Sequence, residues 1–327
     1  MIQKTALYAV IGLLVMTISC RNGTQDSNIK NNPKTALVAP NFNADSAFAF
    51  VETQTGFGPR VPNSEAHRKC GDYLLKQLKH FCDTVFAQPF DVKTYDGKLQ
   101  HACNFIGSFN PNQKKRIILA AHWDSRPMAD QDRDPNRRQI PIDGANDGAS
   151  GVGVLLEVAR QLHLAKPAAG VDIIFFDVED YGTPASENIS GDWWCLGAQH
   201  WAKNLHRAGY TAQFGILLDM VGSSNARFYQ EGVSTLYAQD IVSKVWGRAY
   251  ELGFGHYFIN APAHSVTDDH YYVNTLAKIK MIDIIHQDQT TGTGFDRVWH
   301  THDDNIANID KNTLSVVGKV VLSIIEQ

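Results

Sequence analysis

Residues 171–180 read Val-Asp-Ile-Ile-Phe-Phe-Asp-Val-Glu-Asp, a short apolar run that ends in three carboxylates. The run shows little alternation of polar and apolar positions, which is typical of a strand buried on both faces of a sheet. Comparable runs are found at Arg116–Asp124, Phe214–Met220 and Ala277–Ile285, and weaker strands are predicted at Val85–Lys93 and Asn104–Phe109. The sequence therefore indicates a central sheet whose strands come from most of the chain.

Amphipathic stretches separate the predicted strands. Apolar residues recur in them at helical spacing, which predicts helices at Ser64–Phe81, Val152–Leu164, Ser234–Leu252 and Thr313–Ile325. Ser64 and Thr313 are the expected N-caps, because a hydroxyl there can accept a backbone N–H of the first turn. Strands that alternate with helices predict an α/β fold: a single domain over residues 43–327, with a central twisted, mostly parallel mixed sheet flanked by helices.

The composition is that of an ordinary globular protein. Of the 327 residues, 43% are hydrophobic and 20% are charged, and the formal net charge is −4. This balance excludes disordered and fibrous classes. Because no run of basic residues occurs, no nucleic-acid partner is expected.

The first residues predict export. Lys4 precedes an apolar run that is too short to span a bilayer but suits a signal peptide, here residues 1–19. Ser19 before Cys20 resembles a bacterial lipobox, although Thr17 stands where Leu is usual. Residues 20–42 would then form a polar, lipid-anchored tether, with the lipid as the only membrane contact. The expected location is the cell envelope, on the periplasmic side or the cell surface; a plain secretory signal or an uncleaved anchor are the alternatives.

The four later cysteines give no metal or disulfide motif. Cys70, Cys82, Cys103 and Cys195 form no close CxxC pair. Cys70 and Cys82 would lie about 18 Å apart along the predicted helix, which is too far for a disulfide. Disulfides between the other pairs are an open alternative that the sequence does not assign, and the favoured interpretation of each thiol is a small buried apolar residue.

Polar residues follow the predicted strands where the strands end. His122 and Asp124 end one strand, Glu179 and Asp180 follow another, and Asp219 ends a third. Open α/β sheets bind their ligands at the carboxyl ends of the strands. We therefore expect these side chains to meet at one edge of the sheet.

Several of these segments suit a metal ion. Asp147 lies in a loop of small residues, Gly144–Gly151, where it could ligate a metal or cap the following helix. The carboxylates after the 171–176 run repel one another unless a cation lies nearby; a solvated acidic loop is the alternative. His300 follows Trp299 in a late loop. Histidine, aspartate and glutamate without a thiolate suit zinc.

From about Thr53 to the C-terminus, these motifs and their order resemble the zinc aminopeptidase-like superfamily and, within it, the glutaminyl cyclases (glutaminyl-peptide cyclotransferases). The resemblance implies a zinc-exopeptidase-like fold in which Asp147, Asp180 and His300 ligate one catalytic Zn²⁺. It also implies that Glu179 is the general acid/base. Many relatives have Glu where this chain has Asp180, so the shorter side chain requires the zinc distance or the backbone to adjust.

The resemblance extends to residues around the metal. It implies that Asp219 and Asp268 hold Glu179 in a carboxylate network. Trp299 is expected to form a wall of the substrate pocket, together with Trp193 or its neighbour Trp194. The expected partners are peptides or proteins with an N-terminal glutamine, which would be converted to pyroglutamate with release of ammonia. Residues 128–142 are expected to form a surface loop near this site.

Two other functions remain open from the sequence. His122 and Asp219, with the three ligands above, would complete the two-zinc site of an aminopeptidase of the same fold. The stretch Asp268-Asp269-His270 and the indole of Trp299 favour a cyclase instead, because they resemble the cyclase form of these segments. The other alternative is an inactive protein that only binds peptide N-termini; unpaired carboxylates kept in a cleft without a metal argue against it. The oligomeric state is not predicted.

Overall fold

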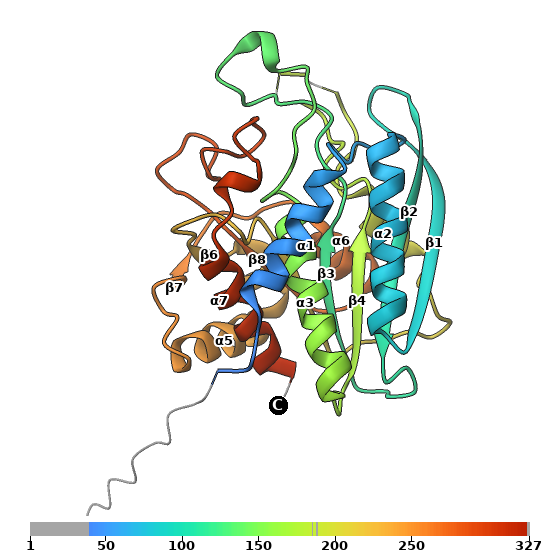
Figure 1. The fold of residues 1–327 in the computed structure, drawn as a ribbon, viewed down its shortest axis with the longest axis vertical. Helices are drawn as coiled ribbons and strands as arrows, with labels where there is room; N and C mark the ends of the chain where they lie inside the picture. The colour runs from blue at the N-terminus through green and yellow to red at the C-terminus, as the bar shows by residue number, and fades with distance from the viewer. Residues whose placement is uncertain (1–38, 185, 188, 326–327) are drawn as a thin grey trace, which may run out of the picture. The chain divides into compact units, whose positions relative to one another are not determined.

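A six-stranded mixed sheet with the strand order β1-β2-β4-β3-β5-β8 forms the centre of the fold (Figure 1). Its strands are β1 (Thr84–Lys93), β2 (Leu99–Phe109), β3 (Arg116–His122), β4 (Gly170–Phe176), β5 (Phe214–Asp219) and β8 (Met281–Ile285). The strands β4, β3, β5 and β8 are parallel, whereas β1 pairs with β2, and β2 with β4, in antiparallel register. This is the predicted fold class.

The structure, a computed structural model, describes residues 39–184, 186–187 and 189–325. The predicted signal peptide and most of the predicted tether lie outside these residues. Within the described part, no helix combines the length and apolar character that crossing a membrane requires.

Helices cover both faces of the sheet. The helices are α1 (Ala44–Gly56), α2 (Glu65–Phe81), α3 (Ala149–Ala165), α4 (Leu196–Lys203), α5 (Gly232–Glu251), α6 (Asp269–Tyr272) and α7 (Lys311–Ile325). Residues of α1, α2, α3, α5 and α7 pack with Leu119 and Ala121 in the larger core. Residues of α4 and α6 pack with Ile118 and Ala120 in a second core on the opposite face. Successive residues of β3 therefore point to different cores, which explains why the strand is apolar throughout.

The predicted helices are confirmed, with changes at their ends. The hydroxyl of Ser64 accepts the backbone N–H of His67 and caps α2, as expected. The expected cap at Thr313 is wrong: Thr313 lies inside α7, and the carboxylate of Asp310 accepts the N–H of Asn312 instead. Helices α1, α4 and α6 were not predicted.

The last predicted strand is shorter than expected. Strand β8 begins at Met281, because Val273–Ala277 forms a turn of π-helix and Lys278 has a positive φ of 58°. The apolar residues of 277–285 thus belong to two different elements. A separate two-stranded parallel sheet pairs β6 (Phe228–Gln230) with β7 (Phe258–Pro262).

Candidate active site

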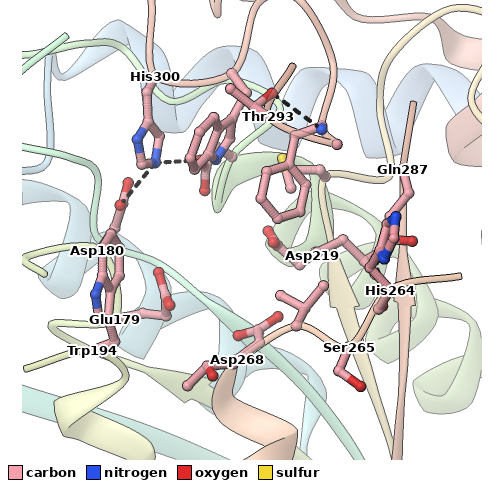
Figure 2. A pocket seen from close by; sticks show the side chains of 18 of the residues that line it. Glu179, Asp180, Trp194, Asp219, His264, Ser265, Asp268, Gln287, Thr293 and His300 are labelled. Carbon is pink, nitrogen blue, oxygen red and sulfur yellow. Dashed lines mark hydrogen bonds and ion pairs between the residues drawn. The ribbon is translucent and has the colours of Figure 1, made fainter. Parts of the chain in front are cut away.

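A cavity of about 560 Å³ lies at the carboxyl ends of β4, β5 and β8. It is lined by the predicted residues Asp147, Glu179, Asp180, Asp219, Asp268, Trp299 and His300. Figure 2 shows Glu179, Asp180 and His300 on one side of this cavity, with His264, Ser265 and Gln287 on the facing side. The expected gathering of polar groups at one edge of the sheet is confirmed.

Asp147, Asp180 and His300 converge as a metal-binding group would. Nε2 of His300 lies 3.2 Å from Oδ1 of Asp180 and 3.6 Å from Oδ2 of Asp147. Ligand atoms in a tetrahedral zinc site with bonds of about 2.0 Å lie about 3.3 Å apart. The three groups are all buried, and their ligand atoms lie within 4.8 Å of one another. Their spacing therefore fits one zinc ion.

Two further observations support a cation at this position. Oδ2 of Asp180 is buried and has no hydrogen-bond partner among the described residues. Burial and the charge of Asp147 raise the pKa of Asp180, because two desolvated carboxylates face each other. A metal ion would supply the missing partner for this oxygen and favour the ionised form of both aspartates.

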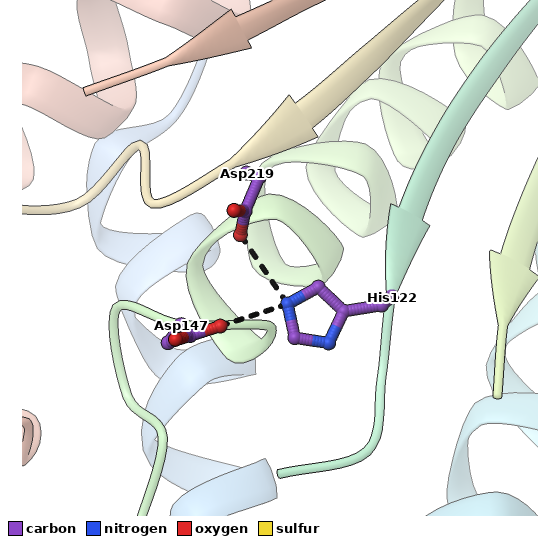
Figure 3. A group of neighbouring side chains, drawn as sticks. All are labelled: His122, Asp147 and Asp219. Carbon is purple, nitrogen blue, oxygen red and sulfur yellow. Dashed lines mark hydrogen bonds and ion pairs between the residues drawn. The ribbon is translucent and has the colours of Figure 1, made fainter. Parts of the chain in front are cut away.

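A second group lies beside the first and shares Asp147. Nε2 of His122 is 3.0 Å from Oδ1 of Asp147 and 3.2 Å from Oδ1 of Asp219 (Figure 3). Although burial disfavours the imidazolium, hydrogen bonds to the surrounding carboxylates raise the pKa of His122 well above its ordinary value. Burial also raises the pKa of Asp219, to about 7. This group meets the geometric requirement for a second metal ion.

The loop that carries Asp147 is held from two sides. A Cβ on Gly148, which has a φ of 89°, would lie 2.8 Å from the carbonyl oxygen of Asp124 and 2.9 Å from Cε1 of His122. Asp304 accepts the backbone N–H of Asp147 at 3.0 Å. The glycine therefore allows close approach to His122, and Asp147 does not cap α3, whose N-cap is Gly148.

Glu179 faces the cavity from the loop after β4. Its Oε1 lies 3.2 Å from Sγ of Cys195, and its Oε2 lies 3.9 Å from Nδ1 of His122. The ligand atoms of Glu179, Cys195 and Asp268 lie within 4.8 Å of one another. Burial raises the pKa of Glu179 well above its ordinary value. The charge of His122 acts to lower this pKa, and the charge of Asp268 acts to raise it. Of the two expected carboxylate partners, Asp268 lies beside Glu179, whereas Asp219 is hydrogen-bonded to His122.

Unusual backbone conformations occur at and beside the residues of this site. Val178, Cys195, Met220 and His300 have positive φ values between 48° and 56°, a region that residues other than glycine rarely adopt. All four are next to, or belong to, the site. Asp124 adds support, because its carboxylate accepts the backbone N–H groups of both Glu179 and Asp180. Strain of this kind is typical of functional sites.

Aromatic rings form part of the cavity wall. Trp299 lies against His300 with ring centroids 3.7 Å apart, in the predicted position. Trp194 also lines the cavity, with its ring within 10° of parallel to that of His300. Trp193 is not among the lining residues, and its indole N–H donates to the carbonyl of Ser190. The pocket position expected for Trp193 is therefore corrected to its neighbour Trp194.

Three contributors were missed in the sequence. Arg126 donates to the carboxylate of Asp180, Asp130 contacts Nδ1 of His300, and Cys195 contacts Glu179. Arg126 comes from the loop after β3, so the sequence next to Asp180 does not reveal this basic neighbour. The clue in the sequence was the density of Asp and Arg in the loop predicted at residues 128–142, which begins two residues after Arg126.

Residues 104–325 match peptidase family M28. The chain is 51% identical to the crystal structure of Bacteroides thetaiotaomicron glutaminyl cyclase bound to N-acetylhistamine, with a TM-score of 0.86, over 89% of this chain and 99% of that chain. It is 50% identical to the structure of a leucine aminopeptidase precursor from the same species, with a TM-score of 0.84, over the same shares. The glutaminyl-peptide cyclotransferase of Drosophila melanogaster is 25% identical over 285 residues, which cover 80% of this chain and 75% of that protein. These matches confirm the resemblance to glutaminyl cyclases, and the chain belongs to peptidase family M28.

Proposed function

We propose that this enzyme is a glutaminyl-peptide cyclotransferase, which converts the N-terminal glutamine of peptides or proteins to pyroglutamate with release of ammonia. The observation that carries the proposal is the convergence of Glu179 with Asp147, Asp180 and His300 on one small cavity. A cavity of about 560 Å³ is within the usual range for small ligands and can hold a glutamine with part of the following residue.

One zinc ion held by Asp147, Asp180 and His300 would polarise the γ-carbonyl of the substrate and stabilise the negative charge that develops on its oxygen. Glu179 accepts a proton from the α-amine as this amine attacks the γ-carbon, and returns the proton to the departing ammonia. Its raised pKa makes the carboxylate a stronger base for this transfer. The amine and the amide belong to one molecule, so the enzyme has only to orient them.

The cavity wall favours cyclisation. The apolar rings of Trp299 and Trp194 lie next to His300. They suit a glutamine side chain that is bent toward its own α-amine, and they limit the space for water. Asp268 lies beside Glu179, in agreement with a network that tunes this glutamate. Both features agree with the cyclase form of the sequence motifs.

The second candidate is a two-zinc aminopeptidase. The group of His122, Asp147 and Asp219 favours it, because a hydrolase needs a second ion to generate a hydroxide nucleophile. The similar structures include one named as a glutaminyl cyclase and one named as an aminopeptidase precursor, so sequence identity does not distinguish the two activities.

A direct comparison of substrates distinguishes these functions. The purified enzyme is incubated in parallel with a glutamine-started peptide, its alanine-started counterpart and an aminopeptidase substrate, and the products are weighed by mass spectrometry. We expect the glutamine peptide alone to lose the mass of one ammonia. Release of a free N-terminal amino acid would instead establish the peptidase, and no turnover together with tight peptide binding would favour a binding protein.

Metal analysis tests the cofactor independently of turnover. We expect about one zinc per chain in protein purified without chelator, held by three protein ligands with a fourth position open for substrate. Two zinc ions per chain, with hydrolysis, would support the aminopeptidase. Protein of normal stability that binds no zinc would contradict both enzyme proposals.

We also propose that the mature protein is anchored in the cell envelope by a lipid on Cys20. This proposal is supported by the sequence around Ser19 and Cys20. Mass spectrometry of membrane-extracted protein tests it: the expected N-terminus is a lipid-modified Cys20. An unmodified N-terminus at any other residue would contradict the anchor.

A further inference from the structure

A buried ion pair in the loop after β3 has no place in the chemistry proposed above. Nε of Arg126 lies 2.8 Å from Oδ1 of Asp130, and Nη2 lies 2.9 Å from Oδ2, so the pair is bidentate. The side chains are 1% and 12% exposed. A buried ion pair of this kind adds little to folding stability compared with an apolar pair in the same place. Its bidentate geometry therefore indicates a role other than stability.

The pair contacts two of the three proposed zinc ligands. Oδ1 of Asp130 lies 3.1 Å from Nδ1 of His300. Nη1 of Arg126 donates to the backbone carbonyl of Asp180 at 3.0 Å and to its Oδ1 at 3.3 Å. His300 and Asp180 are 120 residues apart in sequence, and this pair joins the loops that carry them.

We propose that Arg126 and Asp130 form a positioning unit that presets the metal site before the ion binds. The carboxylate of Asp130 accepts the Nδ1 proton of His300, which leaves the lone pair of Nε2 directed at Asp147 and Asp180. The guanidinium of Arg126 fixes the backbone and the carboxylate of Asp180 in the same frame. Neither residue lines the cavity, and both act through the ligands.

Arg126 also links the metal site to the pocket wall. Its Cζ lies 4.9 Å from the ring centroid of Trp194, the indole that lines the cavity. The same guanidinium therefore supports a zinc ligand and a substrate-facing ring, which accounts for an arginine at this buried position rather than a lysine.

The loop contains its own control. Oδ2 of Asp132 lies 2.7 Å from Nδ1 of His302. Asp132 is two residues after Asp130 and His302 is two residues after His300, so this second aspartate–histidine pair joins the same two segments. His302 belongs to none of the groups found among the described residues that could hold a metal. Substitution of Asp132 therefore disturbs the same loop without removing support from a proposed ligand.

The test measures zinc affinity in Asp130→Asn, Asp130→Ala and Asp132→Asn, by competition with a chromogenic chelator, alongside thermal unfolding. Loss of an outer-shell partner typically lowers metal affinity about 10- to 100-fold. We expect this loss in Asp130→Ala, a smaller one in Asp130→Asn, and unchanged affinity in Asp132→Asn. Because Asp130 acts on zinc binding through its contact with His300, excess zinc should restore most of the turnover of the Asp130 variants.

The inference rests on the proposed metal site, and the two can fail separately. If the parent protein binds no zinc, the proposed function fails. If the parent binds zinc but both Asp130 variants bind it equally tightly, or if Asp132→Asn loses as much affinity, the positioning role is wrong. Should Asp130→Ala fail to fold, Asp130→Asn, which nearly keeps the shape of the side chain, decides by the same criteria.

Discussion

The thiol of Cys195 lies 3.2 Å from Oε1 of Glu179, and the backbone N–H of Cys195 donates to the carbonyl of the same glutamate at 3.0 Å. Burial, reinforced by the nearby charge of Glu179, raises the pKa of this thiol well above its ordinary value. The sulfur therefore stays protonated and serves as a hydrogen-bond donor. One residue thus fixes both the main chain and the carboxylate of the proposed general base.

Removal of this donor should slow turnover without weakening substrate binding. Because one hydrogen bond is worth about 0.5–1.5 kcal/mol, we expect Cys195→Ala to lower kcat by about 2- to 10-fold with little change in KM. Cys195→Ser keeps a donor and should lie closer to the parent. Steady-state kinetics on a glutamine-started peptide checks both variants. Equal kcat values in Cys195→Ala and the parent would show that the contact has no role in turnover.

Glu179→Gln should leave the fold and zinc content unchanged while turnover falls by about 10²- to 10⁴-fold, the usual contribution of a general acid/base. The amide has nearly the same shape but cannot accept the amine proton at neutral pH. Single-turnover assays, with zinc analysis of the same sample, provide the measurement. Near-normal turnover would remove Glu179 from the mechanism.

His300→Ala should abolish zinc binding and turnover together, because Nε2 of His300 is the only nitrogen in its group. His302→Ala is the matched control: this imidazole, two residues after His300, pairs with Asp132, and its loss should leave both properties intact. Zinc stoichiometry by atomic spectroscopy separates the two variants. Stoichiometric zinc in His300→Ala would mean that the ligand set is misassigned.

The sequence could predict the sheet and the place of the site because both depend on local patterns. The apolar runs ending at His122, Phe176 and Asp219 are strands buried on both faces, and parallel strands bring their carboxyl ends to one edge. The identities of the metal ligands came from the resemblance to a known family, since spacing along the chain does not show which carboxylates meet.

The remaining features depend on how loops fold back. The partners of Arg126 and Asp130 lie 54 and 170 residues away, so nothing in their local sequence points to Asp180 or His300. Cys195 is buried, as predicted, but its hydrogen bond to Glu179 is not predicted by the sequence. Trp194 rather than Trp193 lines the cavity, and Cys195, the next residue, has a positive φ of 56° that spacing along the chain does not predict.

The two adjacent tryptophans provide a test of the pocket wall. Trp194 lines the cavity and lies so close to Gly182 that a Cβ there would be 2.0 Å from its ring, whereas Trp193 is outside the lining. Trp194→Ala should raise KM for glutamine-started peptides by about 10-fold or more, since loss of a large buried ring contact costs roughly 1–3 kcal/mol. Trp193→Ala should change KM little. The reverse order of effects would return the pocket role to Trp193.

Stability far from the site should depend on a buried ion pair between β3 and β4. The carboxylate of Asp172 receives two bonds of 2.6 Å from Arg116 and further bonds from Tyr210 and Ser108. Burial alone would raise its pKa, but these donors hold the pKa below the ordinary value of 3.8. Asp172→Asn leaves the guanidinium buried without a counter-charge. We expect the free energy of unfolding at pH 7 to fall by about 3–5 kcal/mol.

The sign of the pH dependence follows from the lowered pKa. A carboxyl that ionises more readily in the folded state contributes stability above its unfolded pKa of about 3.9, and this contribution is lost as the pH falls toward the folded value. The difference between parent and Asp172→Asn should therefore be constant from pH 5 to 7 and narrow below about pH 4. Urea unfolding of both proteins measures this difference in the free energy of unfolding. Chelator is present throughout, which removes the effect of zinc release in acid.

Asp91→Asn, in an exposed pair with His101, is the control and should change stability by less than about 0.5 kcal/mol. A cost at pH 7 no larger than that of the control would show that Asp172 contributes no more than a surface charge.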